Sequence, residues 1–155
     1  MRTHPLIPFA SLIVLGACRP ASQSPPATVS RDQFKQLEWI AGTWRGSGGA
    51  YPAFFEQYRF INDTTILMRS FADSTLRATT DSSVIAWRGG AIRSGSDRSP
   101  SVVVEFSPTS VRFMQPGAAA GGYTFTRVSA DEWTATLHPT TSGGQATVYV
   151  MRRIP

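Results

Sequence analysis

The feature that most constrains the fold is a succession of short strand-like segments separated by turn residues. The segments are rich in Thr, Val and aromatic side chains, which favour extended backbone. Turn pairs such as Asn62-Asp63 and Gly89-Gly90 lie between them. No helical segments alternate with the strands, so a parallel α/β sheet is not expected. The segments cover residues 43–49, 53–61, 64–72, 82–89, 91–95, 101–107, 110–115, 123–129, 132–138 and 146–153.

A count of about eight to ten short strands with hairpin-length links is typical of a meandering barrel or sandwich. We predict an all-β fold, an antiparallel up-and-down barrel, with a sandwich as the alternative. One short helix is expected before the first strand, because Phe34, Leu37 and Ile40 recur at helical spacing. Ser30 and Gln33 fit a capping box at its start.

The first 17 residues have the pattern of a bacterial export signal. Arg2 precedes an apolar stretch over residues 6–15, and the small residues Gly16 and Ala17 follow. A stretch of about ten apolar residues is half of the roughly 20 that a membrane-spanning helix needs. We therefore predict that residues 1–17 are a signal peptide, cleaved after Ala17.

Cys18, the only cysteine in the sequence, follows this signal directly. The run Leu15-Gly16-Ala17-Cys18 resembles the lipobox of bacterial lipoproteins, which implies that Cys18 is lipidated and anchors the chain in a membrane. Each buried methylene contributes about 0.8 kcal/mol, so two or more acyl chains anchor stably. The alternative is an ordinary secretory signal. The predicted location is the bacterial cell envelope, and Arg19 in place of an inner-membrane Asp signal favours the outer membrane.

The rest of the chain divides into a linker and one domain. Residues 19–30 are mainly Pro, Ser and Ala, a composition that cannot offset the entropy of ordering. Residues 18–30 are therefore predicted to be the lipidated cysteine and a flexible linker. Residues 31–155 are long enough to form one domain with its own core.

The start of the first strand carries the family resemblance. Gly42-Thr43-Trp44 resembles the opening of lipocalin-like barrels, where the glycine permits a sharp turn and the tryptophan fills the barrel floor. Residues 42–52 are similar to the first strand of nitrobindins, which are haem-binding barrels. A looser resemblance, over most of the domain, is to bacterial lipoproteins with an uncharacterised lipocalin-like domain. It is carried by residues 37–46, Glu56, Tyr58, 66–69 and 113–116.

Both resemblances break down at the positions that carry histidine. Nitrobindins ligate haem iron through a histidine near the C-terminus, but residues 143–153 contain none. His138, the only histidine after the predicted signal, precedes a proline in a predicted loop. The uncharacterised family carries a His-Asp-Phe-Pro run where this chain has residues 117–122, which are glycine and alanine. The resemblance therefore implies a fold rather than haem chemistry.

No catalytic constellation is evident in the sequence. Nucleophilic triads need a histidine base, zinc sites need Cys/His clusters, and no phosphate-binding GxxxxGK[ST] loop is present. We predict a protein that is not an enzyme and that has no metal or cofactor. Nucleic acid is not an expected partner of an exported protein, although the net charge of +5 is compatible with contacts to anionic lipid.

A ligand site is the functional hypothesis that follows from a barrel. By alternation, Glu56 shares a face with Tyr58, and Glu105 shares one with Val103. If these faces point inward, the glutamates need partners, and an Arg–Glu pair would bind the carboxylate or polar head of a ligand. Alternatively, both glutamates face solvent. The candidate partners are Arg69 and Arg112. The candidate ligand-binding residues are Trp44, Glu56, Tyr58, Arg69, Trp87, Glu105 and Phe113.

Three functions remain compatible with these observations. The first is a membrane-tethered barrel that binds a small hydrophobic or amphipathic molecule in its interior. The second is a barrel with a filled interior that serves as an envelope interaction or structural module. The third is a haem protein in the manner of nitrobindins. Whether the interior is open or filled separates the first from the second.

The lipidation prediction has a direct test. Replacing the thiol in Cys18→Ser removes the atom to which diacylglycerol would be attached, so labelling with a radioactive or clickable fatty acid should be lost. The protein should also leave the membrane fraction. Retained labelling of Cys18→Ser would contradict the assignment.

Overall fold

The structure is a computed structural model that describes residues 24–96 and 98–155. The predicted signal peptide, its cleavage site at Ala17 and the lipidation site Cys18 lie outside the described residues. Those assignments stay predictions. Among the described residues, no helix is long and apolar enough to cross a bilayer.

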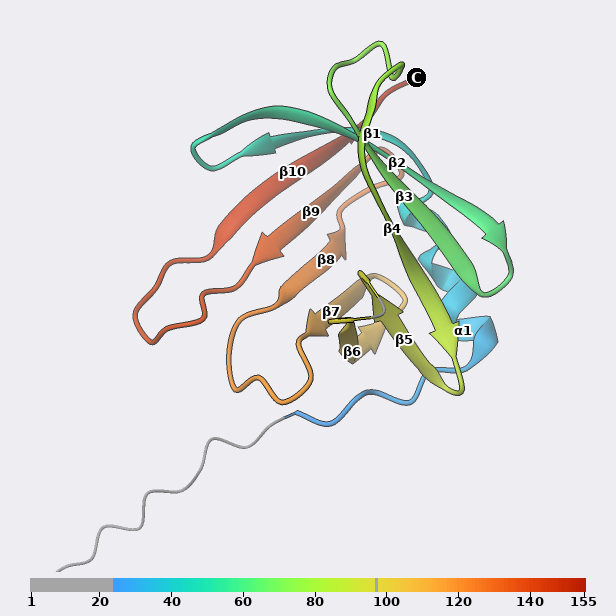
Figure 1. Cartoon of the computed structure of the whole chain (residues 1–155), viewed down its shortest axis with the longest axis vertical. Helices are drawn as coiled ribbons and strands as arrows, with labels where there is room; N and C mark the ends of the chain where they lie inside the picture. The colour runs from blue at the N-terminus through green and yellow to red at the C-terminus, as the bar shows by residue number, and fades with distance from the viewer. Residues whose placement is uncertain (1–23, 97) are drawn as a thin grey trace, which may run out of the picture.

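Ten antiparallel strands follow one another around a closed barrel (Figure 1). Each strand pairs with its neighbours in sequence, and β1 also pairs with β10, which completes the ring. The predicted all-β, up-and-down barrel is confirmed, and closure excludes the sandwich. The strands are β1 (Gly42–Gly48), β2 (Tyr51–Asn62), β3 (Thr65–Phe71), β4 (Thr79–Arg88), β5 (Ala91–Ser94), β6 (Ser101–Ser107), β7 (Ser110–Met114), β8 (Tyr123–Arg127), β9 (Glu132–Leu137) and β10 (Thr147–Arg153).

The predicted short helix is present and begins as expected. Helix α1 (Arg31–Lys35) has a capping box in which the Ser30 side chain accepts from the Gln33 amide and the Gln33 side chain accepts from the Ser30 amide. The chain then tightens into a 3₁₀ turn, η1 (Gln36–Ile40). The apolar side chains of this segment are buried, and the Phe34 ring packs edge-on against Phe60 of β2 at 5.7 Å. The helical segment thereby covers one end of the barrel.

Gly42 makes the transition from this segment into β1. Its φ of +137° lies in a region that side chains rarely adopt. A Cβ at this position would also collide with the Arg153 guanidinium. Both facts explain why a glycine precedes Trp44 by two residues.

Trp44 fills the covered end of the barrel, as the resemblance implied. Its side chain is fully buried, and its indole N–H donates to the Ile40 carbonyl at 2.7 Å. The Trp133 ring packs edge-on against it at 5.8 Å, and the Arg153 guanidinium lies 4.2 Å from its ring centre. Arg153 also donates to the Ala41 carbonyl at 3.0 Å. One side chain of β10 thus links the helical segment to the first strand.

The segment before α1 differs from the predicted flexible linker in its last residues. Ala27 donates its amide to the Val103 carbonyl, and Val29 donates to the Gly90 carbonyl, both at 2.8 Å. Val29 is 1% exposed, and its carbonyl accepts from the Trp87 indole at 2.7 Å. The prediction of a flexible linker was wrong for residues 27–29. Amino-acid composition carries no information about backbone hydrogen bonds to distant strands or about the burial of a single valine. The folded domain therefore begins by Ala27 rather than at Arg31.

The two terminal arginines provide a test of how the covered end is held. Arg153→Ala should lower the free energy of unfolding by about 2 kcal/mol, because it removes a cation–π contact and hydrogen bonds from a charged donor. The matched control is Arg152→Ala, whose side chain is 70% exposed and pairs with Glu132 at the surface. That change should cost less than about 1 kcal/mol. Urea denaturation measures both, and equal losses would contradict the bridging role of Arg153.

Candidate functional site

A cavity of about 420 Å³ occupies the barrel interior on the side away from the helical segment. It is bounded there by Gly95 and Ser99 of the β5–β6 loop and by Gln115, which follows β7. These loops lie at the opposite end of β5 and β7 from the turns near the helical segment. The lining residues are Phe54, Glu56, Tyr58, Met68, Ser83, Ile85, Ser94, Gly95, Ser99, Ser101, Gln115, Tyr123, Phe125, Trp133, Ala135, Leu137, Tyr149 and Met151.

An aromatic cluster forms the inner end of this cavity. Trp133 of β9 is 1% exposed and contacts Phe125 at 4.8 Å and Tyr58 at 5.7 Å between ring centres. Behind it, Trp133 packs against Trp44. The inner wall of the cavity and the plug of the barrel floor therefore share one tryptophan.

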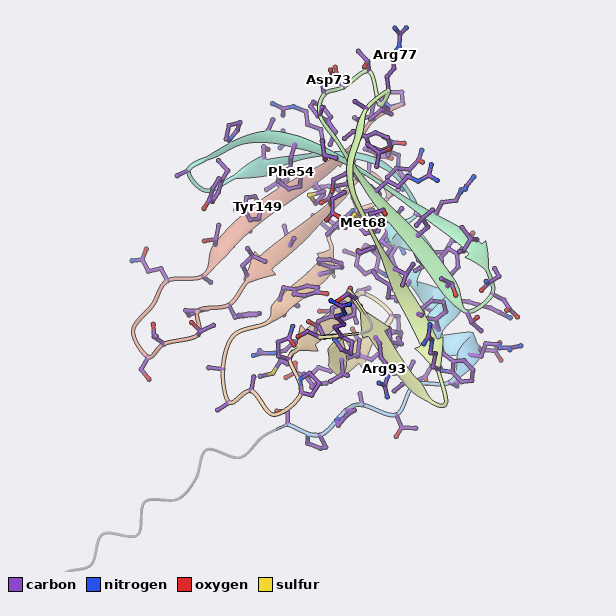
Figure 2. All side chains as sticks on the ribbon, in the orientation of Figure 1. Phe54, Met68, Asp73, Arg77, Arg93 and Tyr149 are labelled. Carbon is purple, nitrogen blue, oxygen red and sulfur yellow. The ribbon has the colours of Figure 1, made fainter. Side chains whose placement is uncertain are left out.

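A second aromatic pair stands on β2 and β10. Phe54 and Tyr149, both labelled in Figure 2, meet edge-to-face at 5.4 Å. The Phe54 ring lies across Gly46 of β1, where any Cβ would collide with it. The absent side chain at Gly46 thus makes room for the ring, an arrangement in which a cross-strand aromatic covers a glycine. This pair gives the cavity an apolar side wall.

Glu56 brings a carboxyl group into this largely apolar space. It lies between Phe54 and Tyr58 on the inward face of β2, and the Tyr58 hydroxyl donates to its Oε2 at 2.8 Å. Burial raises the pKa of Glu56, while hydrogen bonds from Tyr58 and Ser70 partly oppose that rise. Burial and the nearby Glu56 carboxylate raise the pKa of Tyr58 well above its usual value. The Tyr58 hydroxyl therefore keeps its proton at physiological pH and acts as a hydrogen-bond donor to Glu56.

A chain of neutral polar groups lies on another part of the wall. The Ser99 hydroxyl donates to the Gln115 side-chain carbonyl at 3.1 Å, and the Gln115 amide donates to the Ser101 hydroxyl at 3.2 Å. The Tyr123 hydroxyl interacts with Ser94 and Ser101, and burial raises its pKa. These groups are hydrogen-bonded to one another across β5, β6, β7 and β8. They offer hydrogen bonds to a ligand but no charge.

Of the predicted ligand-binding residues, Glu56 and Tyr58 line the cavity. Three aromatic candidates are instead packed in its surroundings. Trp44 lies behind Trp133, and Phe113 stacks on Tyr123 at 4.8 Å without reaching the cavity surface. Trp87 is covered by the N-terminal segment, through the hydrogen bond to Val29. Trp44 and Phe113 thus support the wall rather than form it, and Trp87 is not among the lining residues.

The inward placement of Arg69 is wrong. Arg69 pairs with Gln57 across β2 and β3, so it shares the outward face, and its side chain is exposed. The residue opposite Glu56 is Ser70. The register of β2 and β3 therefore places Ser70, and not Arg69, on the inward face with Glu56, because successive residues of a strand point to opposite faces.

The inward placement of Glu105 is wrong as well. A β-bulge between Val103 and Glu105 inserts one residue into β6, so that Val103 pairs with Phe113 while Glu105 pairs with Arg112. Beyond the bulge the alternation is reversed, and Glu105 is exposed on the outer face. The alternative considered from the sequence, a solvent-facing glutamate, holds for Glu105.

Sequence reasoning missed much of the wall. Alternation along residues 132–138 places Trp133, Ala135 and Leu137 on one face of the strand. In the structure this face of β9 lines the cavity. No comparable signal identifies Ser99 or Gln115, because they lie in loops whose path depends on the assembled barrel.

His138 does not face the cavity. It follows β9, and its Nε2 lies 2.7 Å from the Thr124 hydroxyl on the outer side of β8. Partial burial and the neighbouring Arg112 guanidinium lower its pKa. Within the described residues, no group of three or more His, Cys, Asp or Glu side chains is arranged to hold a metal ion.

Comparisons with known proteins give no family. No protein-family model and no curated protein matches the chain. Among solved structures, a redesigned β-barrel is similar at 12% identity and a TM-score of 0.40, over 77% of this chain and 96% of that one. Function has to be inferred from the cavity itself.

The buried carboxyl group predicts a pH-dependent effect on stability. Folding raises the pKa of Glu56 above 4.5, so the folded state binds the Glu56 proton more tightly than the unfolded state does. The contribution of protonated Glu56 to the free energy of unfolding is therefore lost as the pH rises through the raised pKa. Glu56→Gln keeps an acceptor for Tyr58 without the charge. In the ligand-free protein, it should raise the melting temperature near neutral pH and give a smaller gain at about pH 4. Glu105→Gln, outside the barrel, is the control, and a gain for Glu56→Gln that did not depend on pH would contradict this account.

Proposed function

We propose that this protein binds one small amphipathic molecule inside its barrel. The observation that carries the proposal is the cavity of about 420 Å³, which is walled by aromatic and aliphatic side chains and contains a few inward polar groups. Small-molecule sites typically have volumes of about 300–1,000 Å³ and this mixture of apolar wall and placed polar groups. A filled barrel would leave no such space.

The lining suggests how a ligand would be held. Apolar contacts with the Trp133, Phe125 and Phe54 rings would supply most of the affinity, since apolar burial is the main driving force. Glu56 and the Ser101–Gln115 group would orient its polar end. Because the rings are already packed against one another, little ordering would be needed on binding.

The proposal includes tethering of this binding domain to a membrane through Cys18. The N-terminal segment meets the barrel at Val103 of β6, through the Ala27 amide, and at Gly90 in the β4–β5 turn, through the Val29 amide. The cavity is bounded by the β5–β6 loop at the other end of β5. A tether that continues this segment toward Cys18 would therefore leave the barrel beside β6.

Native mass spectrometry of the full chain tests the binding function. After gentle desalting, we expect a reproducible mass above that of the polypeptide, which disappears on denaturation. Ala135→Phe places a ring in the cavity wall and should abolish the extra mass while circular dichroism shows an intact barrel. If the wild-type protein retains nothing from its native host and also takes up no apolar probe, the proposal is overturned.

A further inference from the structure

The charge of the cavity wall selects among amphipathic ligands. Glu56 is the only Asp or Glu among the described lining residues, and none of them is Lys, Arg or His. Its hydrogen-bond partners, Tyr58 and Ser70, are neutral hydroxyl groups. A carboxylate in an apolar site without a counter-ion is costly, and a partner of opposite charge reduces that cost. No described lining residue provides such a partner.

The hydrogen bond from Tyr58 helps to keep this carboxyl group available as an anion. A donor aimed at a carboxylate favours the ionised form. The hydroxyl of Ser70, directly opposite on β3, acts in the same sense. Glu56 has a second carboxylate oxygen, and only Oε2 is used by Tyr58.

Aromatic rings line the same cavity as this carboxylate. Tyr58 links Glu56 to the cluster, because its hydroxyl bonds the carboxylate while its ring contacts Trp133 at 5.7 Å and Phe125 at 6.5 Å. The rings of Phe54 and Tyr149 stand farther along the wall. Ring faces attract cations, most strongly when the site is shielded from water. A carboxylate beside several rings is a favourable environment for a positively charged nitrogen.

We infer that the ligand of this cavity carries a cationic nitrogen, a protonated amine or a quaternary ammonium, on an apolar body. The nitrogen would lie against Glu56 and the Tyr58–Trp133 rings, with the apolar body toward Phe54 and Tyr149. An anionic ligand such as a fatty acid would meet a like charge and no cation in the described wall. This inference rests on the proposed function and reverses the expectation of a carboxylate ligand held by an Arg–Glu pair.

The test uses three probes that share one skeleton and differ only in the polar end. Phenylbutylamine, phenylbutanol and phenylbutyrate are titrated by calorimetry into the purified full chain near neutral pH. We expect the amine to bind about ten-fold or more tightly than the alcohol, which corresponds to roughly 1.4 kcal/mol, and the carboxylate to bind most weakly. Glu56→Gln should remove the preference for the amine over the alcohol. Glu105→Gln, which removes the same charge from the outer face, should leave the order intact.

The outcomes separate this inference from the proposed function. If amine and alcohol bind equally, or if Glu56→Gln leaves the preference for the amine in place, the cationic class is overturned while ligand binding stands. If the carboxylate binds best, the charge argument is overturned outright. If no probe binds the wild-type chain and native mass spectrometry also finds no ligand, the binding function fails together with the inference.

Discussion

The contact of Arg153 with Trp44 is the interaction on which the rest of the structure depends. These residues are paired across β1 and β10, the two strands that close the ring. The guanidinium lies over the indole and also holds the Ala41 carbonyl at the end of the helical segment. One contact therefore joins three features of the fold. These are the pairing that closes the ring, the helical segment that covers one barrel end, and the buried tryptophan of the floor. Because β1 and β10 pair with each other, neither terminal strand presents an unpaired edge.

On the far side of Trp133, side chains do not fill the barrel interior, and the space that they leave is the cavity. A fully packed interior would be more stable, since every void forfeits dispersion contacts. Glu56 adds a further cost by placing a carboxyl group among rings. Stabilising contacts are concentrated instead at the covered end, in the Trp44, Trp133 and Tyr58 rings. This division of the barrel into a packed end and a hollow end agrees with the proposed binding function, because functional sites commonly limit stability.

Two small backbone features decide which side chains reach the hollow end. Gly46 lets the Phe54 ring lie flat on β1, where a methyl group would displace it. The bulge between Val103 and Glu105 turns a glutamate outward that simple alternation would place inside. The consequence is electrostatic. With Glu105 and Arg69 outside, the described wall retains a single charge, on Glu56, and its chemistry follows from that residue.

The sequence by itself determined a succession of about eight to ten short strands, the short capped helix and the glycine turn into β1, while the resemblance to lipocalin-like barrels implied the floor role of Trp44. These depend on local propensity, turn chemistry and side-chain size, which act over a few residues. It also placed Glu56 and Tyr58 on one face, because β2 alternates regularly there. Only the tertiary structure decided the bulge in β6, the pairing of Arg69 with Gln57, the docking of Val29 and the approach of Gln115 to Ser101. Each of these depends on register or loop path between segments far apart in the chain, and a one-residue shift in register reverses which face is buried.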